Sequence, residues 1–279
     1  MITNESILVY RGLRYFKWAL ALVVIASAVY AWHSPIPAPN GGTWLGYALG
    51  TIGALLIVWL LWFGVRKRRY GGGKVRLEDW LSAHVYLGIA LIVVATLHTG
   101  FQFGWNVHTL AYTLMMIVIF SGMFGVYVYI RYPKIMTDNR RGMTLDAMMT
   151  QIAELDQDCR KAALRLGDEV NRLVLDASEK TAIGGGMWRQ LSGEDKKCPA
   201  ISAPDRVRAL LGRTDQSGAG RDAEQLLALL TRKSELVLRA RRDVQIKALM
   251  DIWLYIHVPL SIALIGALIA HIVSVFFYW

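Results

Sequence analysis

The chain has 279 residues, 54% of them hydrophobic, with a mean hydropathy of +0.35 and a formal net charge of +10. The charges are unevenly placed, because three runs contain no Asp, Glu, Lys or Arg: 18–65, 80–130 and 252–279. This pattern excludes an ordinary soluble enzyme and indicates an all-α membrane protein with one soluble segment.

The uncharged runs predict five membrane-spanning helices. A helix needs roughly 20 apolar residues to cross a bilayer, and we expect the spans at about 15–32, 44–65, 80–101, 108–130 and 250–277. Arg14 and Lys17 before the first apolar run resemble the start of a secretory signal, which we expect to be retained as a signal-anchor.

The basic residues predict the orientation of the chain, because Lys and Arg beside short loops are retained in the cytoplasm. They lie before the first span, between the second and third spans, and in 131–247, whereas the loops at 33–43 and 102–107 have none. We therefore expect a cytoplasmic (inner) membrane protein with a cytoplasmic N terminus and an extracytoplasmic Trp279. The same rule explains most of the net charge, so that nucleic-acid binding is not expected.

The segment between the last two spans predicts a cytoplasmic helical hairpin. Apolar residues spaced alternately by three and four from Leu145 to Ala177 predict one coiled-coil-like helix over about 143–178. A break rich in Gly and Pro follows at 180–220, and a second apolar seam from Leu226 to Val244 leads into the last span.

This organisation gives four expected regions. They are a signal-anchor helix with an outer loop (1–42), spans two to four (43–131), the cytoplasmic hairpin (132–247) and span five (248–279). The hairpin has two alternative uses, a structural spacer or oligomerisation element, and a docking platform for a redox partner with 180–220 at its tip.

The two cysteines carry no recognisable cofactor motif. Cys159 lies on the apolar seam and is interpreted as a small core residue, whereas Cys198 lies in the predicted loop and could be reactive. Two thiols are too few for an iron–sulfur cluster, and the chain has no haem-attachment or nucleotide-binding motif. A redox cofactor would have to be held in another way.

All six histidines lie in the uncharged runs, and four of them form a regular pattern. His84 and His98 are 14 residues apart on the third span, and His257 and His271 are 14 apart on the fifth. Fourteen residues make nearly four helical turns and rise about 21 Å, so that both histidines of a helix share one face. Both helices start in the cytoplasm, which predicts an inner pair, His84 and His257, and an outer pair, His98 and His271.

Two stacked pairs of imidazoles predict two b-type haems, because haem iron accepts two axial histidines from facing helices of a bundle. Zinc is the competing metal, but it would want further Cys, His or carboxylate ligands at each depth. We interpret His33 and His108, which have no partner at this spacing, as outer-surface residues that form interfacial hydrogen bonds or contact a haem propionate or a quinol.

Residues on neighbouring spans agree with two haems. The second and fourth spans have small residues at the same spacing of 14, namely Gly50 and Ala111 at the outer depth and Gly64 and Gly125 at the inner depth. Ordinary helix packing also uses such residues. For the inner propionates, the candidate partners are basic residues at the cytoplasmic ends of the spans: Arg66, Arg69, Arg76 and Arg131.

The segment from His84 to His98 resembles the ligand helix of dihaem membrane cytochromes b, in which two histidines are separated by thirteen residues, and His257 to His271 matches the second ligand helix. The order of the spans is more similar to the ferric-reductase or NADPH-oxidase membrane domain than to cytochrome b of quinol:cytochrome c oxidoreductases. The resemblance covers about 44–130 and 250–277. The chain departs from both families, because it has no flavin and nicotinamide domain, lacks the Pro-Glu-Trp-Tyr motif and carries the long insertion before span five.

The expected function is that of a dihaem electron-transfer subunit of a membrane oxidoreductase complex. Its partner would be a soluble or peripheral redox subunit, such as a flavoprotein, an iron–sulfur protein or a cytochrome c, and a second copy of the chain is a further candidate. One alternative is a quinol- or quinone-reactive membrane anchor, which would add quinone as a cofactor. The other is a non-redox membrane scaffold with a cytoplasmic coiled coil.

Overall fold

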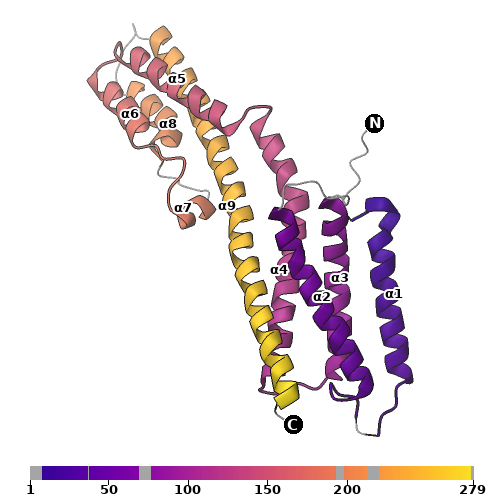
Figure 1. Cartoon of the computed structure of the whole chain (residues 1–279). Helices are drawn as coiled ribbons and strands as arrows, with labels where there is room; N and C mark the ends of the chain where they lie inside the picture. The colour runs from indigo at the N-terminus through magenta and orange to yellow at the C-terminus, as the bar shows by residue number, and fades with distance from the viewer. Residues whose placement is uncertain (1–7, 37, 69–76, 193–197, 213–219, 278–279) are drawn as a thin grey trace. The chain divides into compact units, whose positions relative to one another are not determined.

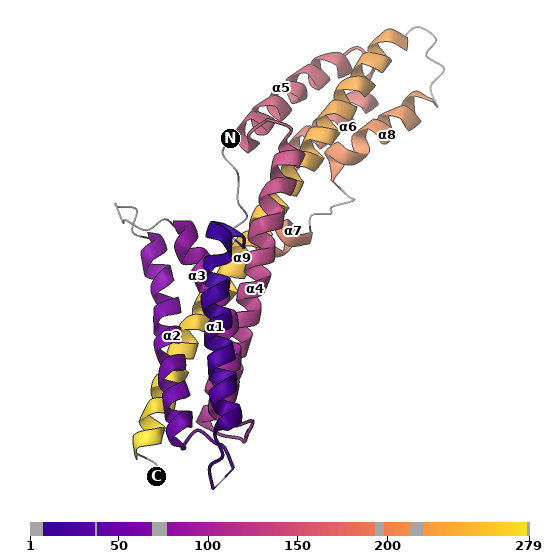
Figure 2. The same cartoon turned by 90° about the vertical axis from the view of Figure 1, so that its right-hand side faces the viewer.

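The computed structural model describes residues 8–36, 38–68, 77–192, 198–212 and 220–277. All regular secondary structure in these ranges is α-helical (Figures 1 and 2). The helices are α1 (Tyr10–Trp32), α2 (Trp44–Arg68), α3 (Leu77–Thr99), α4 (Val107–Arg140), α5 (Leu145–Ala163), α6 (Asp168–Glu179), α7 (Met187–Ser192), α8 (Pro199–Leu211) and α9 (Gly220–Phe277).

The chain divides into two compact units. One, the apolar unit, comprises Met1–Ile130 and Trp253–Trp279, and the other, the charged unit, comprises Arg131–Ile252. Helix α9 has 58 residues and is continuous through Pro259, so that the second apolar seam and the last predicted span belong to one helix, as the sequence predicts.

The prediction of five potential membrane spans is confirmed, since five of the described helical stretches are long and apolar enough to cross a bilayer. Their ends lie close to the expected residues, except that α4 continues past Ile130 to Arg140 with Pro133 inside it and α9 begins at Gly220. Helix α1 is interrupted at Arg11–Leu13, where all three residues have left-handed backbone angles, so that its regular part starts near the predicted residue 15.

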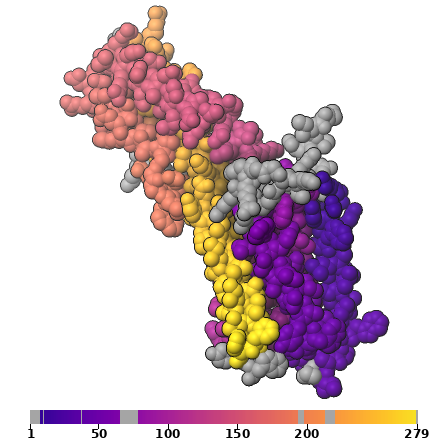
Figure 3. All heavy atoms as spheres, viewed as in Figure 1, coloured from indigo at the N-terminus to yellow at the C-terminus, as the bar shows by residue number. Residues whose placement is uncertain are grey.

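The apolar unit carries large hydrophobic side chains on its outside, as a helix bundle in lipid requires. In α9, Ile262, Ile269 and Phe276 are exposed, and α1 exposes Trp18 and Ile25. Figure 3 shows the C-terminal part of α9, in yellow, forming one face of this unit beside α2. Apolar side chains such as these suit a hydrocarbon solvent.

The interior of the apolar unit is built around α3, which packs against both α1 and α2. A buried cluster of Leu91, Met115 and Leu264 joins α3, α4 and α9. Leu91 is midway in sequence between His84 and His98, and Leu264 is midway between His257 and His271. An aliphatic layer therefore separates the two histidine levels.

The single helix predicted for about 143–178 is wrong, because the chain leaves the helix after Ala163 and starts α6 at Asp168. Gly167 precedes α6 with φ +95°, a left-handed value that glycine adopts at little cost. Thr144 caps α5 by accepting a hydrogen bond from the Ala147 N–H. The predicted break at 180–220 contains two further helices, α7 and α8, and Pro199 occupies the first turn of α8, where its missing N–H costs nothing.

The charged unit has two apolar clusters that use both predicted seams. One contains Cys159, Val170 and Leu226, and the other contains Met148, Cys198 and Val237. The segment is thus held together by packing of α5, α6, α8 and the first part of α9. Both thiols are buried.

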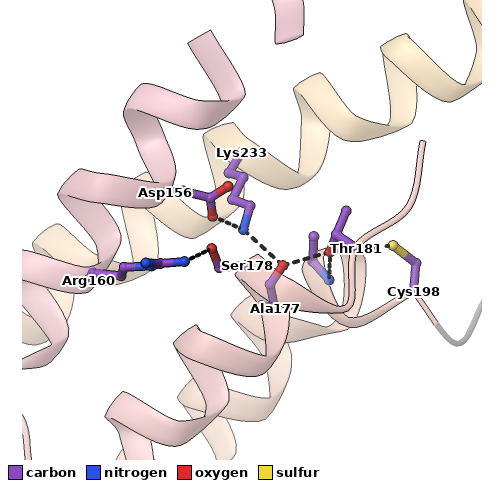
Figure 4. A network of polar contacts seen from close by, with 8 residues as sticks. Asp156, Arg160, Ala177, Ser178, Thr181, Cys198 and Lys233 are labelled. Atoms are coloured by element: carbon purple, nitrogen blue, oxygen red, sulfur yellow. Dashed lines mark hydrogen bonds and ion pairs between the residues drawn. The ribbon is translucent and has the colours of Figure 1, made fainter. Parts of the chain in front are cut away.

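A polar network connects these helices (Figure 4). The buried Lys233 ammonium on α9 forms an ion pair with Asp156 on α5 and donates a hydrogen bond to the Ala177 carbonyl at 3.0 Å. The Thr181 hydroxyl donates to the same carbonyl at 2.6 Å and accepts the Ala200 N–H at 3.2 Å. Lys233 therefore has charged and neutral partners that compensate for its burial.

Candidate functional site

The four histidines of the sequence pattern lie on α3 and α9 of the apolar unit and are half-buried. His98 and His271 are close neighbours, with ring centroids 5.9 Å apart and ring planes at 84°. The structure therefore brings the predicted outer pair together, and we call it the His98 pair. The inner pairing of His84 with His257 stays a prediction.

The His98 ring is fixed by the backbone of α2. Its Nδ1 lies 2.7 Å from the carbonyl oxygen of Gly46. Because a carbonyl oxygen only accepts, Nδ1 carries the proton and Nε2 keeps its lone pair. Neutral imidazole with one free nitrogen is the form that ligates a metal.

The His257 ring is fixed in the same way by a hydroxyl group on α4. Its Nδ1 lies 2.7 Å from Ser121 Oγ, which in turn donates its proton to the Val118 carbonyl at 2.8 Å. The hydroxyl has one proton and has used it, so it accepts from His257 Nδ1–H. Nε2 of His257 is therefore also left with its lone pair.

His271 has another histidine as its partner. Its Nδ1 is 2.6 Å from Nδ1 of His108, and the two rings meet edge to face with centroids 4.6 Å apart. His108 is exposed, in keeping with its interpretation as a surface residue, but the sequence did not predict its contact with His271.

His84 is the most enclosed of the four rings, and Phe63 packs on it with centroids 5.0 Å apart. Its Nδ1 is buried and has no partner within hydrogen-bonding geometry among the described residues, although the ring interacts at longer range with the Leu60 backbone carbonyl. Leu60 follows Gly46 by 14 residues on α2. The two α2 carbonyls that face His98 and His84 are therefore 14 residues apart, the same separation as that of the two histidines on α3.

The predicted small residues differ in what they touch. A Cβ on Gly50 would lie 2.7 Å from His98 Cε1, so that only glycine leaves this ring in place, whereas Gly64 has no neighbour near its Cβ position. Gly125 makes room for the Trp253 indole, which a Cβ would meet at 2.0 Å. Ala111 is half-buried. Their roles toward a haem stay predictions.

The predicted basic partners are mostly beyond what the structure describes. Arg69 and Arg76 lie outside the described residues, and only the backbone of Arg66 is described. Arg131 is exposed and belongs to the charged unit. A different polar group lies one turn from His84, since Trp80 Nε1 is buried without a partner among the described residues, its ring stacked on Trp59.

Sequence reasoning missed three residues around His257. Ser121 is its hydrogen-bond partner, and Trp253 packs beside it with ring centroids 5.4 Å apart. Gly122 lies against the same ring, since a Cβ at this position would be 3.4 Å from His257 Cε1. The Trp253 N–H donates to the Ser121 carbonyl at 2.7 Å, which links the two. The available signal was Ser121 itself, because a hydroxyl inside an uncharged span needs a partner.

The thiols of the charged unit are not arranged for chemistry. Burial raises the pKa of Cys159, in α5 beyond the uncharged runs, to about 11, so that it remains a thiol at neutral pH. Cys198 Sγ is buried beside the Thr181 hydroxyl at 4.0 Å. Both environments suit core residues rather than nucleophiles.

The ring centroids of the His98 pair are separated by about the distance that two imidazoles on one metal ion require. Two metal–imidazole bonds of roughly 2 Å on opposite sides of an ion place the ring centroids about 6 Å apart, close to the 5.9 Å between His98 and His271. Among the described residues no group of three or more His, Cys, Asp or Glu side chains could hold a metal. A bis-imidazole haem site needs two, whereas a closed zinc site needs four.

No protein family, curated protein or solved structure matches this chain.

Proposed function

We propose that this protein is a dihaem b-type cytochrome subunit that carries electrons between the two faces of a cytoplasmic-type membrane. The observation that carries the proposal is how the histidine rings contact one another and which hydrogen bonds their Nδ1 atoms form. His98 on α3 lies beside His271 on α9, and His98 and His257 have hydrogen-bonded Nδ1–H groups that leave Nε2 free to ligate.

His84 and His257 would hold the inner haem, and His98 and His271 the outer one. Bound haem would supply one-electron transfer at its iron. The chain's own contribution is orientation, because a histidine ligand that donates its second N–H to a carbonyl or hydroxyl has its tautomer and ring angle fixed and its basicity raised. The Gly46 carbonyl and the Ser121 hydroxyl supply these acceptors.

The surroundings of the rings support the same assignment. Gly50 leaves room for the ring of the outer ligand His98, Ala111 would lie beside the outer haem and Gly64 beside the inner one, while Gly125 and Gly122 let α4 approach Trp253 and His257. Trp80 Nε1–H is a buried donor one turn toward the N-terminal end of α3 from His84, and would serve an inner propionate together with arginines such as Arg66, Arg69, Arg76 and Arg131.

The distribution of basic residues supports an orientation with the N terminus and the charged unit in the cytoplasm and Trp279 outside. With no flavin or cluster motif of its own, the subunit would exchange electrons with a partner. The charged unit is the expected docking platform for a soluble or peripheral flavoprotein, iron–sulfur protein or cytochrome c.

A quinol-reactive anchor is the second candidate, and one observation favours it. The His33 ring packs edge to face on Trp44 with centroids 5.1 Å apart, and its Nε2 is buried without a partner among the described residues. A ring nitrogen held beside an aromatic surface suits hydrogen bonding to a quinol hydroxyl.

Redox-difference spectra of the purified full-length protein test the main proposal. We expect a b-type signal at two haems per chain, and His98→Ala should remove one haem while the other stays. A protein without b-type haem would leave the membrane scaffold as the better description. Haem reduction by a quinol analogue without partner proteins would favour the quinol-reactive anchor, and co-purification of a redox protein that is lost on deletion of 180–220 would favour the docking platform.

A further inference from the structure

His271 differs from the other three candidate ligands in the partner of its Nδ1. His98 bonds a backbone carbonyl, His257 bonds a serine hydroxyl, and His84 meets only a backbone carbonyl at longer range. His271 instead bonds the side chain of His108, at 2.6 Å between the two Nδ1 atoms.

The direction of this hydrogen bond follows from the chemistry of the two rings. Two neutral nitrogens at this distance share one proton, so one ring donates and the other accepts. If His271 ligates iron through Nε2, its Nδ1 carries the proton and His108 Nδ1 accepts it. His108 then carries its own proton on Nε2.

His108 is held in place by the start of α4. The Asn106 side chain accepts the Thr109 N–H at 2.9 Å, and the Asn106 carbonyl accepts the Leu110 N–H at 3.1 Å. Thr109 Oγ1 in turn accepts the Gly104 N–H at 3.1 Å. A cap of this kind fixes the first helical turn, and His108 lies within that turn.

We propose that His108 is the positioning residue of the outer axial ligand, accepting the Nδ1–H of His271 and thereby setting its ring orientation and its donor strength. This role rests on the proposed dihaem function. The acceptors of His98 and His257 are a backbone carbonyl and a hydroxyl group, whereas His108 is a replaceable and exposed side chain. The outer haem is therefore the one whose electronic properties a single surface residue controls.

The test compares two substitutions of nearly equal size. His108→Asn keeps an acceptor, because the asparagine Oδ1 takes nearly the position of histidine Nδ1, whereas His108→Leu removes it. In the full-length haem-loaded protein we expect the leucine variant to raise the midpoint potential of the outer haem and shift its low-spin electron paramagnetic resonance signal, since a weaker donor stabilises the ferric state less. The asparagine variant should stay close to the wild type.

The inner haem gives an internal reference, because its midpoint potential should stay unchanged in both His108 variants. Identical outer-haem potentials and spectra in the wild type and in His108→Leu would overturn the inference while leaving the dihaem function intact. Equal shifts in both His108 variants would also overturn it, because packing and not hydrogen bonding would then be the cause. A wild-type protein without haem would remove the proposed function and this inference together.

Discussion

Nδ1 of His98 and the carbonyl oxygen of Gly46 lie 2.7 Å apart, although 52 residues separate them in the chain. The contact is possible because Gly50, one turn further along α2, has no side chain on the face that the imidazole occupies. The position of this ring therefore depends on a glycine that does not itself bond to it.

Gly50→Ala should displace His98, since the added Cβ would come within 2.7 Å of its Cε1 atom. We expect loss of the hydrogen bond to Gly46 and a roughly 10–100-fold weaker outer haem, the usual cost of losing an outer-shell partner. Haem content and difference spectra of the purified variant measure this. Gly64→Ala on the same helix is the control for the outer haem, because nothing lies near its Cβ position and it belongs to the inner level, and an equal loss of the outer haem in that variant would refute the explanation.

Ser121→Ala should weaken the inner haem. It removes the acceptor of His257 Nδ1–H, so the ring loses both its fixed tautomer and its orientation, at a cost of roughly 10–100-fold in affinity. Haem titration followed spectroscopically gives the affinity. Ser261→Ala is the control, because it removes a hydroxyl on α9 that donates to the His257 carbonyl and not to its ring, and we expect it to retain both haems.

Asp156→Ala should destabilise the charged unit strongly. The Lys233 side chain is 1% exposed and would lose its charged partner, which for a buried pair costs about 3–5 kcal/mol. Hydrogen exchange of the full chain, followed at peptides from α5 and α6, reports the free energy of local opening.

Two comparisons define the origin of that effect. Asp176→Ala breaks an exposed pair with Lys180 and should cost less than about 1 kcal/mol. The double variant Asp156→Leu with Lys233→Met removes both charges together and should recover most of the loss. If the single and double variants open equally easily, the ion pair does not explain the stability of this unit.

Both cysteines should resist alkylation while the protein is folded. Cys159 and Cys198 are buried, and with its pKa raised to about 11 the Cys159 thiol has little thiolate at pH 8. We expect maleimide labelling in mild detergent to be slow and labelling in denaturant to be fast at both sites, with mass spectrometry locating the label. Rapid native labelling of Cys198 alone would support the reactive loop cysteine considered from the sequence.

The sequence predicted the spans well because charge is so costly in hydrocarbon that its absence marks them directly. It predicted that His98 would lie beside His271 because a spacing of 14 fixes the face and level of each histidine on its α-helix. It could not predict Ser121 or His108 as partners, because those contacts depend on how α4 is rotated against α9, which no spacing within one helix determines.

The errors in the charged unit have local causes. The apolar spacing continues from Cys159 to Leu166 without a change of period, so the end of α5 is marked only by Gly167 and its left-handed backbone. Pro199 and Pro204 suggested a loop, although proline is compatible with a first turn, and α8 was missed for that reason.

The aliphatic layer of Leu91, Met115 and Leu264 has a consequence for a membrane that stores a proton gradient. It offers no polar atom from its side chains to support a chain of water molecules between the two histidine levels, so hydrated ions would meet a barrier there. Electrons can tunnel through such a layer, whereas protons need a hydrogen-bonded path. In the proposed cytochrome this layer would let charge cross the membrane as electrons without an accompanying leak of protons.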